Sequence, residues 1–124
     1  MITILVDVDD TLVLWQPHAV PDCYDYHNTF WAPNNILIEE IKHHYLENYP
    51  NCAIVVWSAG GKDYAQLWAD KFFADYRPLG VAKDIDILGL LFEEDIVIDD
   101  MAEEMNLYGG RPIVYKPNDL SWRQ

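Results

Sequence analysis

Five carboxylates stand at the ends of two apolar runs in this chain of 124 residues. Residues 2–6 lead into one group and residues 96–98 into the other, and the five are Asp7, Asp9, Asp10, Asp99 and Asp100. Carboxylates that meet without partners repel one another, and hard oxygen ligands gathered in this way favour a divalent cation such as Mg²⁺. In proteins Mg²⁺ keeps several waters and is held by one or two carboxylates together with substrate phosphate. The pattern therefore predicts a Mg²⁺ site that binds a phosphorylated ligand.

The elements that must position these acids are short apolar runs separated by helix signals. The runs lie at residues 2–6, 53–57, 79–82, 96–98 and 113–115. They are mostly continuous rather than alternating, which is typical of parallel strands that are covered on both faces. The helix signals lie between them, at residues 35–48, 62–77, 84–92 and 101–107. The alternation predicts an α/β protein with an open, doubly wound, Rossmann-like parallel sheet.

This architecture brings distant residues together, because ligands of open parallel sheets bind beyond the carboxyl ends of the strands, where the strand order reverses. Asp7, Ser58 and Asp99 each stand at such an end, and Lys116 follows the last run. We therefore expect these side chains to form one site. Local structure is the alternative explanation, since the acids before the last helix could cap it and Ser58 could stabilise a turn.

The composition narrows the class of partner. Eight basic residues against 21 acidic ones give a formal charge of −13, and a chain this acidic repels the phosphates of a polynucleotide. Apolar residues make up 51% of the chain, which is enough for a single folded domain over residues 1–124. Cys23 and Cys52 have no zinc or redox spacing. Neither a membrane-spanning run nor a secretory leader is apparent, so we expect a cytoplasmic protein.

Three segments resemble motifs of the haloacid dehalogenase (HAD) superfamily of phosphatases, in its small type without a cap domain. Asp7-Val8-Asp9-Asp10-Thr11-Leu12 is similar to the first motif, in which DxDxT follows an apolar strand. Trp57-Ser58-Ala59-Gly60 is similar to the second motif, in which Ser or Thr ends a strand, and Ile96-Val97-Ile98-Asp99-Asp100 is similar to the acidic fourth motif. The motifs come in family order and, with the helices between them, cover nearly the whole chain.

The resemblance implies a role for each of these residues. Asp7 would attack phosphorus and form an aspartyl-phosphate. Asp9 would protonate the leaving oxygen and later take a proton from the hydrolytic water. Ser58 and the amides of Ala59 and Gly60 would hold the phosphoryl oxygens. The implied ligands of Mg²⁺ are Asp7, the main-chain carbonyl of Asp9, and Asp99 or Asp100.

Two parts of the implied site have more than one candidate residue. The third motif of the family is a lysine that bridges nucleophile and phosphate. Lys83 fits the motif order best, and Lys62 and Lys116 are the alternatives. The second acid of the fourth motif is either the adjacent Asp100, which we prefer, or Glu103 one helical turn later.

Residues 12–33 occupy the place where a hairpin flap follows the first motif in this family. The segment is too short for a folded cap domain. Its candidates for contact with a substrate are Trp15, His18, His27 and Trp31. The aromatic rings could stack on a nucleobase. Alternatively, they could form a small satellite core or a subunit interface.

The residues and the resemblance together predict a Mg²⁺-dependent phosphatase that hydrolyses a phosphomonoester through an aspartyl-phosphate. The aromatic flap favours a nucleoside monophosphate, and a sugar phosphate or a phosphate on a macromolecule is the alternative. Without a cap, water must be excluded by the flap or by a neighbouring subunit of a homo-oligomer. A non-catalytic metal- or phosphate-binding module of the same fold is the alternative outside enzymes. A phosphoacceptor signalling domain fits less well, because it expects the phosphorylated aspartate where this chain has Ser58.

Overall fold

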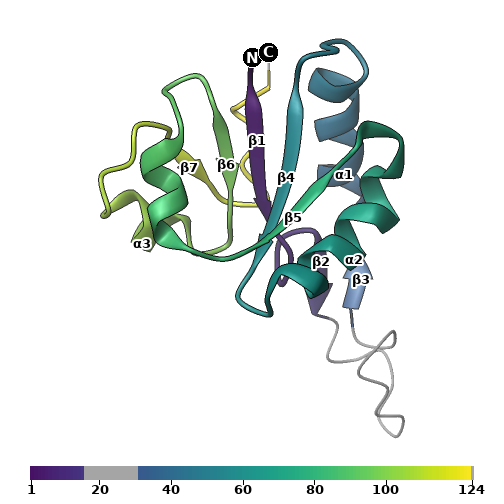
Figure 1. Cartoon of the computed structure of the whole chain (residues 1–124), viewed down its shortest axis with the longest axis horizontal. Coiled ribbons are helices and arrows are strands. Elements are labelled where there is room, and N and C mark those ends of the chain that lie inside the picture. Colours follow the sequence, from purple (N-terminus) through teal and green to yellow (C-terminus); the bar gives the residue numbers. More distant parts are fainter. Residues whose placement is uncertain (16–30, 124) are drawn as a thin grey trace, which may run out of the picture.

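The computed structural model describes residues 1–15 and 31–123, and its centre is a five-stranded parallel sheet in the order β5-β4-β1-β6-β7 (Figure 1). The chain runs outward from β1 to β5 and then returns past β1 to β6 and β7, so the strand order reverses at β1. Helices flank the sheet, and the predicted α/β class with a parallel sheet is confirmed. The strands are β1 (Thr3–Asp7), β4 (Ala53–Ser58), β5 (Leu79–Ala82), β6 (Ile96–Ile98) and β7 (Val114–Tyr115).

The sheet is buried on both faces, as its continuous apolar strands predict. In β1, Ile4 and Val6 belong to one core cluster and Leu5 belongs to the other. The first cluster includes apolar side chains of the helices α1 (Asn35–Ile41) and α2 (Lys62–Phe73), and the second includes those of α3 (Ala102–Asn106). Figure 1 shows α3 beside β6 and β7, whereas α1 and α2 lie toward β4 and β5.

The strand register decides which side chains share the carboxyl edge of the sheet. Asp7 pairs with Trp57 across β1 and β4, so Ser58 follows one residue later. On the other side of β1, Val6 pairs with Ile98, so Asp99 lies level with Asp7. The predicted convergence of these strand ends is therefore present in the backbone alone.

Two predicted helices differ in type from the prediction. The segment expected to be helical at 84–92 forms a 3₁₀ helix, η3 (Ile85–Leu90), whose first turn is capped by the Asp84 carboxylate accepting the Asp86 N–H at 3.0 Å. Such local side-chain bonds compete with the α-helix. The helix expected at 35–48 is α-helical only in α1 and continues as a π-helix, η1 (Lys42–Leu46). Apolar spacing does not distinguish these helix types. A 3₁₀ turn, η2 (Ala74–Tyr76), ends α2.

The two ends of the predicted flap pair as an antiparallel hairpin. Strand β2 (Val13–Trp15) runs beside β3 (Trp31–Pro33), with Trp15 opposite Trp31 in the backbone register. Asn34 ties the hairpin to its surroundings, because its side-chain amide donates to the Thr11 carbonyl at 3.0 Å and its carboxamide oxygen caps α1. His18 and His27, which the sequence proposes as substrate contacts, lie outside the described residues.

Within the described part of the chain, no helix is long and apolar enough to cross a membrane. Helix α2, for example, has 12 residues, whereas a helix that crosses a bilayer needs about 20. The cytoplasmic location expected from the sequence stays a prediction.

Candidate metal and phosphate site

Three buried polar side chains meet where the strand order reverses. Asp7 ends β1, Ser58 ends β4 and Asp99 follows β6, and each is at most 5% exposed. Lys83 joins them from the residue after β5, where its N–H donates to the Ser58 carbonyl at 2.9 Å. Four strands of the sheet therefore contribute to one site.

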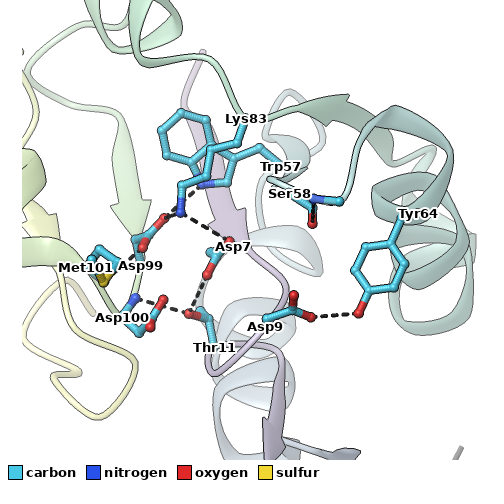
Figure 2. A network of polar contacts seen from close by, with 11 residues as sticks. Asp7, Asp9, Thr11, Trp57, Ser58, Tyr64, Lys83, Asp99, Asp100 and Met101 are labelled. Atoms are coloured by element: carbon cyan, nitrogen blue, oxygen red, sulfur yellow. Dashed lines mark hydrogen bonds and ion pairs between the residues drawn. The ribbon is translucent and has the colours of Figure 1, made fainter. Parts of the chain in front are cut away.

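The amine of Lys83 lies between two of the acids (Figure 2). Its Nζ is 2.8 Å from Asp99 Oδ2 and 3.4 Å from Asp7 Oδ1. It also stands 5.4 Å from the centre of the Trp57 ring, within the range of a cation–π contact. Burial alone would lower the pKa of Lys83, but its hydrogen bond with Asp99 and the charge of Asp7 raise it. Lys83 is therefore a fixed cation in the site.

Asp99 already has donors on both of its oxygens. Its Oδ2 accepts the Trp57 indole Nε1–H at 3.1 Å in addition to the Lys83 contact. Its Oδ1 accepts the main-chain N–H of Met101 at 2.9 Å. Part of the local-structure interpretation of this acid is thus correct, since Asp99 stabilises the turn that leads into α3. Because Lys83 and Trp57 occupy its carboxylate, Asp99 has few free lone pairs for a metal ion.

Thr11 connects the two acidic segments through its buried hydroxyl. The hydroxyl donates to Asp7 Oδ2 at 3.3 Å, and it accepts the main-chain N–H of Asp100 at 3.1 Å (Figure 2). This bridge holds the loop after β1 against the loop after β6. The threonine of the DxDxT segment thereby fixes the spacing between the two groups of acids.

The carboxylates of Asp7, Asp99 and Asp100 offer oxygens that all lie within 4.8 Å of one another. An all-oxygen set with two or more carboxylates matches the preference of Mg²⁺. Asp7 and Asp100 are the better candidates for direct ligands, because Asp99 is engaged by three donors. The residues present therefore fit a hard divalent cation.

Without a cation, this cluster retains a proton near neutral pH. Burial and, after it, the charge of Asp99 together raise the pKa of Asp7 from its ordinary value of 3.8 to about 8, against the opposing charge of Lys83. Burial also raises the pKa of Asp100. A divalent cation bound by these carboxylates would displace the proton.

The side chain of Asp9 points away from the three clustered acids. Its Oδ1 accepts the Tyr64 hydroxyl at 2.6 Å, on the side of the site that faces α2 (Figure 2). Tyr64 lies in the helix predicted at residues 62–77, and apolar spacing alone does not predict this contact. One signal could have suggested the contact. Tyr64 carries a hydroxyl on its aromatic ring and stands near the start of the helix that follows Ser58.

The turn after β4 uses part of its own hydrogen-bonding capacity. The Ser58 hydroxyl accepts the Gly60 N–H at 2.9 Å, and the Ser58 carbonyl accepts the Gly61 N–H at 3.1 Å. The turn interpretation of Ser58 is therefore correct as far as it goes. Gly60, whose amide is implied to hold phosphate, already donates to Ser58, whereas Ala59 lies exposed beside the site.

The alternative lysines and the alternative acid lie elsewhere. Lys116 pairs with Glu103 at 2.8 Å, and both are exposed. Lys62 is exposed at the start of α2. Among the described residues, the lysine beside Asp7 is thus Lys83, as the motif order predicts. Of the flap candidates, Trp15 and Trp31 are described only as backbone partners of the hairpin.

A groove of about 510 Å³ opens beside the acidic cluster. It runs between the hairpin, the first turn of α1 and the segment after β7. Its lining residues are Asp10, Leu14, Asn34, Ile36, Asp100, Lys116, Pro117, Asn118 and Leu120. Asp100 belongs to both the groove and the candidate metal cluster, so the two are continuous.

No protein-family model, curated protein sequence or solved structure matches the chain. Any functional assignment therefore rests on the side chains at the carboxyl edge of the sheet.

Proposed function

We propose that the chain is a Mg²⁺-dependent phosphomonoester hydrolase of the HAD type, which forms an aspartyl-phosphate on Asp7. The observation that supports this proposal most directly is the pairing of a buried Asp7 with both a cation and an acid cluster. Lys83 Nζ stands 3.4 Å from Asp7, and oxygens of Asp99 and Asp100 lie within 4.8 Å. A nucleophilic carboxylate that must approach a phosphate dianion needs such positive charge beside it.

The proposed metal ligands are the carboxylates of Asp7 and Asp100 and the main-chain carbonyl of Asp9. Asp99 has a different role, because it holds Lys83 at 2.8 Å and Trp57 at 3.1 Å. Bound Mg²⁺ supplies positive charge that offsets the carboxylates and orients the phosphate. Asp99 therefore positions the lysine, and the adjacent Asp100 faces the metal.

The proposed reaction has two displacements at phosphorus. In the first, a carboxylate oxygen of Asp7 bonds to phosphorus, the bond to the leaving alcohol breaks, and the Asp9 carboxyl donates its proton to the leaving oxygen. In the second, Asp9 takes a proton from water, the water oxygen bonds to phosphorus, and the bond to Asp7 breaks. Lys83 and Ser58 stabilise the phosphoryl oxygens in both. The charge of Lys83 also lowers the pKa of Asp7, which favours the attacking carboxylate form.

The groove beside Asp100 supports a small organic leaving group. Its lining combines apolar side chains with the amide and amine groups of Asn118 and Lys116, and a volume of about 510 Å³ suits a nucleoside or a sugar. The net charge of −13 disfavours a polynucleotide end. A nucleoside monophosphate is our first choice of substrate, and a sugar phosphate is the alternative.

Release of inorganic phosphate from para-nitrophenyl phosphate tests the activity, with Mg²⁺ and with a chelator. We expect turnover only with Mg²⁺ and only with Asp7 present. Asp75→Asn is the matched control, because Asp75 is an exposed acid of η2 that lies outside both the acidic cluster and the groove. Turnover that survives Asp7→Asn or the chelator would overturn the mechanism.

Trapping of the intermediate tests the chemistry separately from the rate. Protein quenched in acid during turnover of a labelled phosphomonoester should retain label on Asp7, and hydroxylamine should remove it, as expected for an acyl phosphate. A panel of nucleoside monophosphates and sugar phosphates then ranks the leaving groups by kcat/KM. Label that persists in Asp7→Asn would assign the nucleophile to another residue.

A further inference from the structure

The hydroxyl of Tyr64 makes the shortest polar contact described for Asp9. The oxygen–oxygen distance to Asp9 Oδ1 is 2.6 Å, which is within the range of charge-assisted O–H···O⁻ bonds. Figure 2 shows the Asp9 side chain directed toward this phenol and away from Asp99 and Asp100. The contact links an acid of the first strand's loop to α2, 55 residues later in the chain.

The ring of Tyr64 is held at a fixed position by its neighbours. The ring of Trp68, one turn later in α2, packs edge-on against it with centroids 6.4 Å apart. Gly60 also lies close to the ring, because a Cβ added there would stand only 2.9 Å from Tyr64 Cδ2. The absence of a side chain at Gly60 therefore lets the ring sit directly on the turn that follows Ser58.

We propose that Tyr64 is the positioning residue for Asp9, and that it holds this carboxyl group beside the phosphate-binding turn and apart from the metal-binding acids. The inference rests on the proposed function, in which Asp9 exchanges a proton with the leaving oxygen and then with water. It adds a residue that none of the resembled motifs contains. Because Tyr64 donates to Oδ1, the other oxygen of Asp9 is the one left to exchange protons with the substrate.

Two further observations agree with this role. Burial and the hydrogen bond to Asp9 raise the pKa of Tyr64 to about 12, so the phenol keeps its proton and remains a donor throughout the neutral range. Figure 2 also shows that Asp9 is directed away from the metal cluster, where its carboxylate would attract the same Mg²⁺. A fixed donor on the opposite side prevents a carboxyl needed for proton transfer from becoming another metal ligand.

The leaving group provides the sharpest test, because only a poor leaving group needs its proton. For Tyr64→Phe with Mg²⁺, we expect kcat/KM for an alkyl phosphate to fall about tenfold, a fraction of what general acid catalysis contributes. For para-nitrophenyl phosphate we expect a change of less than about twofold, since nitrophenolate leaves without protonation. The comparison uses kcat/KM, which reports the steps up to the aspartyl-phosphate, because a misplaced Asp9 slows the later hydrolysis for both substrates. Equal losses of kcat/KM on both substrates, or no loss on either, would overturn the positioning role.

A double-mutant cycle separates positioning from a general effect on the fold. In an Asp9→Ala background, Tyr64→Phe should cause no further loss on the alkyl phosphate, because its partner is gone. Tyr108→Phe is the matched control, since Tyr108 is 67% exposed, and it should behave as the wild type. Additive losses in the double mutant would contradict the proposal.

A measurement without metal or substrate tests the contact itself. In proton NMR of the metal-free protein, the Tyr64 hydroxyl should give a slowly exchanging downfield resonance that disappears in both Tyr64→Phe and Asp9→Ala. Its absence from the wild type would overturn the inference whatever the activity. If the wild type shows this resonance but releases no phosphate from any substrate, the proposed function fails, and the role of Tyr64 in catalysis fails with it.

Discussion

The central sheet buries Asp95 at its amino edge and Asp7, together with Asp99, at its carboxyl edge, and the surroundings of Asp95 and Asp7 are opposite. Asp95 and Asp7 are both 5% exposed. At the amino edge, Asp95 accepts the main-chain N–H groups of Thr3 at 2.8 Å and Phe92 at 2.7 Å, one on each oxygen. At the carboxyl edge, Asp7 shares its surroundings with two more carboxylates. Equal burial therefore has different meanings at the two edges.

The difference lies in what compensates each buried charge. Backbone donors compensate Asp95, so this acid ties the start of β1 to the loop before β6 and needs nothing further. Asp7 has Lys83 and Thr11 as donors but faces like charges as well, which raises its pKa. A buried acid whose charge is only partly compensated by the protein is the kind that a ligand completes. We therefore expect Asp7 to act in the site and Asp95 to act only in the scaffold.

The largest expected effect is the loss of turnover in Asp7→Asn. We expect phosphate release to fall at least about a thousandfold, or about 4 kcal/mol of transition-state stabilisation, because the amide is a poor nucleophile. Asp95→Asn should keep kcat within about twofold, once folded protein is selected, because Asp95 lies at the other edge of the sheet. Steady-state release of phosphate measures both. If the two variants lose similar activity, the contrast between the edges has no functional meaning.

The second expected effect is stabilisation by Mg²⁺. A cation at one hundred times its Kd adds about 2.7 kcal/mol to the free energy of unfolding, and urea unfolding with and without Mg²⁺ measures it. Asp95→Asn should retain this gain, whereas Asp7→Asn and Asp100→Asn should lose most of it. A full gain in Asp100→Asn would exclude Asp100 as a ligand and would leave Asp99 as the alternative partner of Asp7.

The carboxyl edge itself could be predicted from the sequence, because it depends only on where apolar runs end. Asp7, Ser58 and Asp99 each follow such a run, and parallel strands bring their ends to one edge. Lys83 follows from its position after the next strand, and the structure places its amine 3.4 Å from Asp7. Local pattern is sufficient where backbone register alone decides the outcome.

The contacts that hold these groups in place could not be predicted in the same way. Apolar spacing assigns Tyr64 to the core, and the apolar strand ending at Trp57 indicates burial. Each nevertheless uses its polar tip, since Trp57 donates to Asp99 and Tyr64 donates to Asp9. The same limit applies to the bond between Asp95 and the Thr3 N–H, because these residues stand 92 positions apart in the chain. Such contacts depend on how elements cross, and residue spacing within one element does not contain that information.

The third expected effect concerns stability, for which the substitution of Asp95 should have a larger effect than the substitution of Asp7. Asp95→Asn should lower the free energy of unfolding by about 2 kcal/mol, because the single amide oxygen cannot replace both carboxylate oxygens and leaves either the Thr3 or the Phe92 N–H, both part-buried, without its acceptor. Asp7→Asn should leave the metal-free protein at least as stable as the wild type, since an amide adds no charge to the buried acidic cluster at any pH. Urea unfolding in the presence of a chelator measures both. A loss of about 2 kcal/mol in Asp7→Asn as well would show that Asp7 is a scaffold acid.

The smallest expected effect, counted per pH unit, is a dependence of stability on pH that arises from Asp7. The pKa of Asp7 is about 8 in the folded protein, against an ordinary value of 3.8. Between these values the folded state keeps a proton that the unfolded chain has lost, so this group makes the metal-free protein less stable as pH rises, by at most about 1.4 kcal/mol per pH unit. Asp7→Asn removes the proton exchange, so the difference in unfolding free energy between variant and wild type should grow with pH and level off above about pH 8. Taking the difference cancels groups that titrate alike in both proteins. A difference that stays constant across this range would mean that Asp7 is ionised without a metal and that its charge is compensated as fully as that of Asp95.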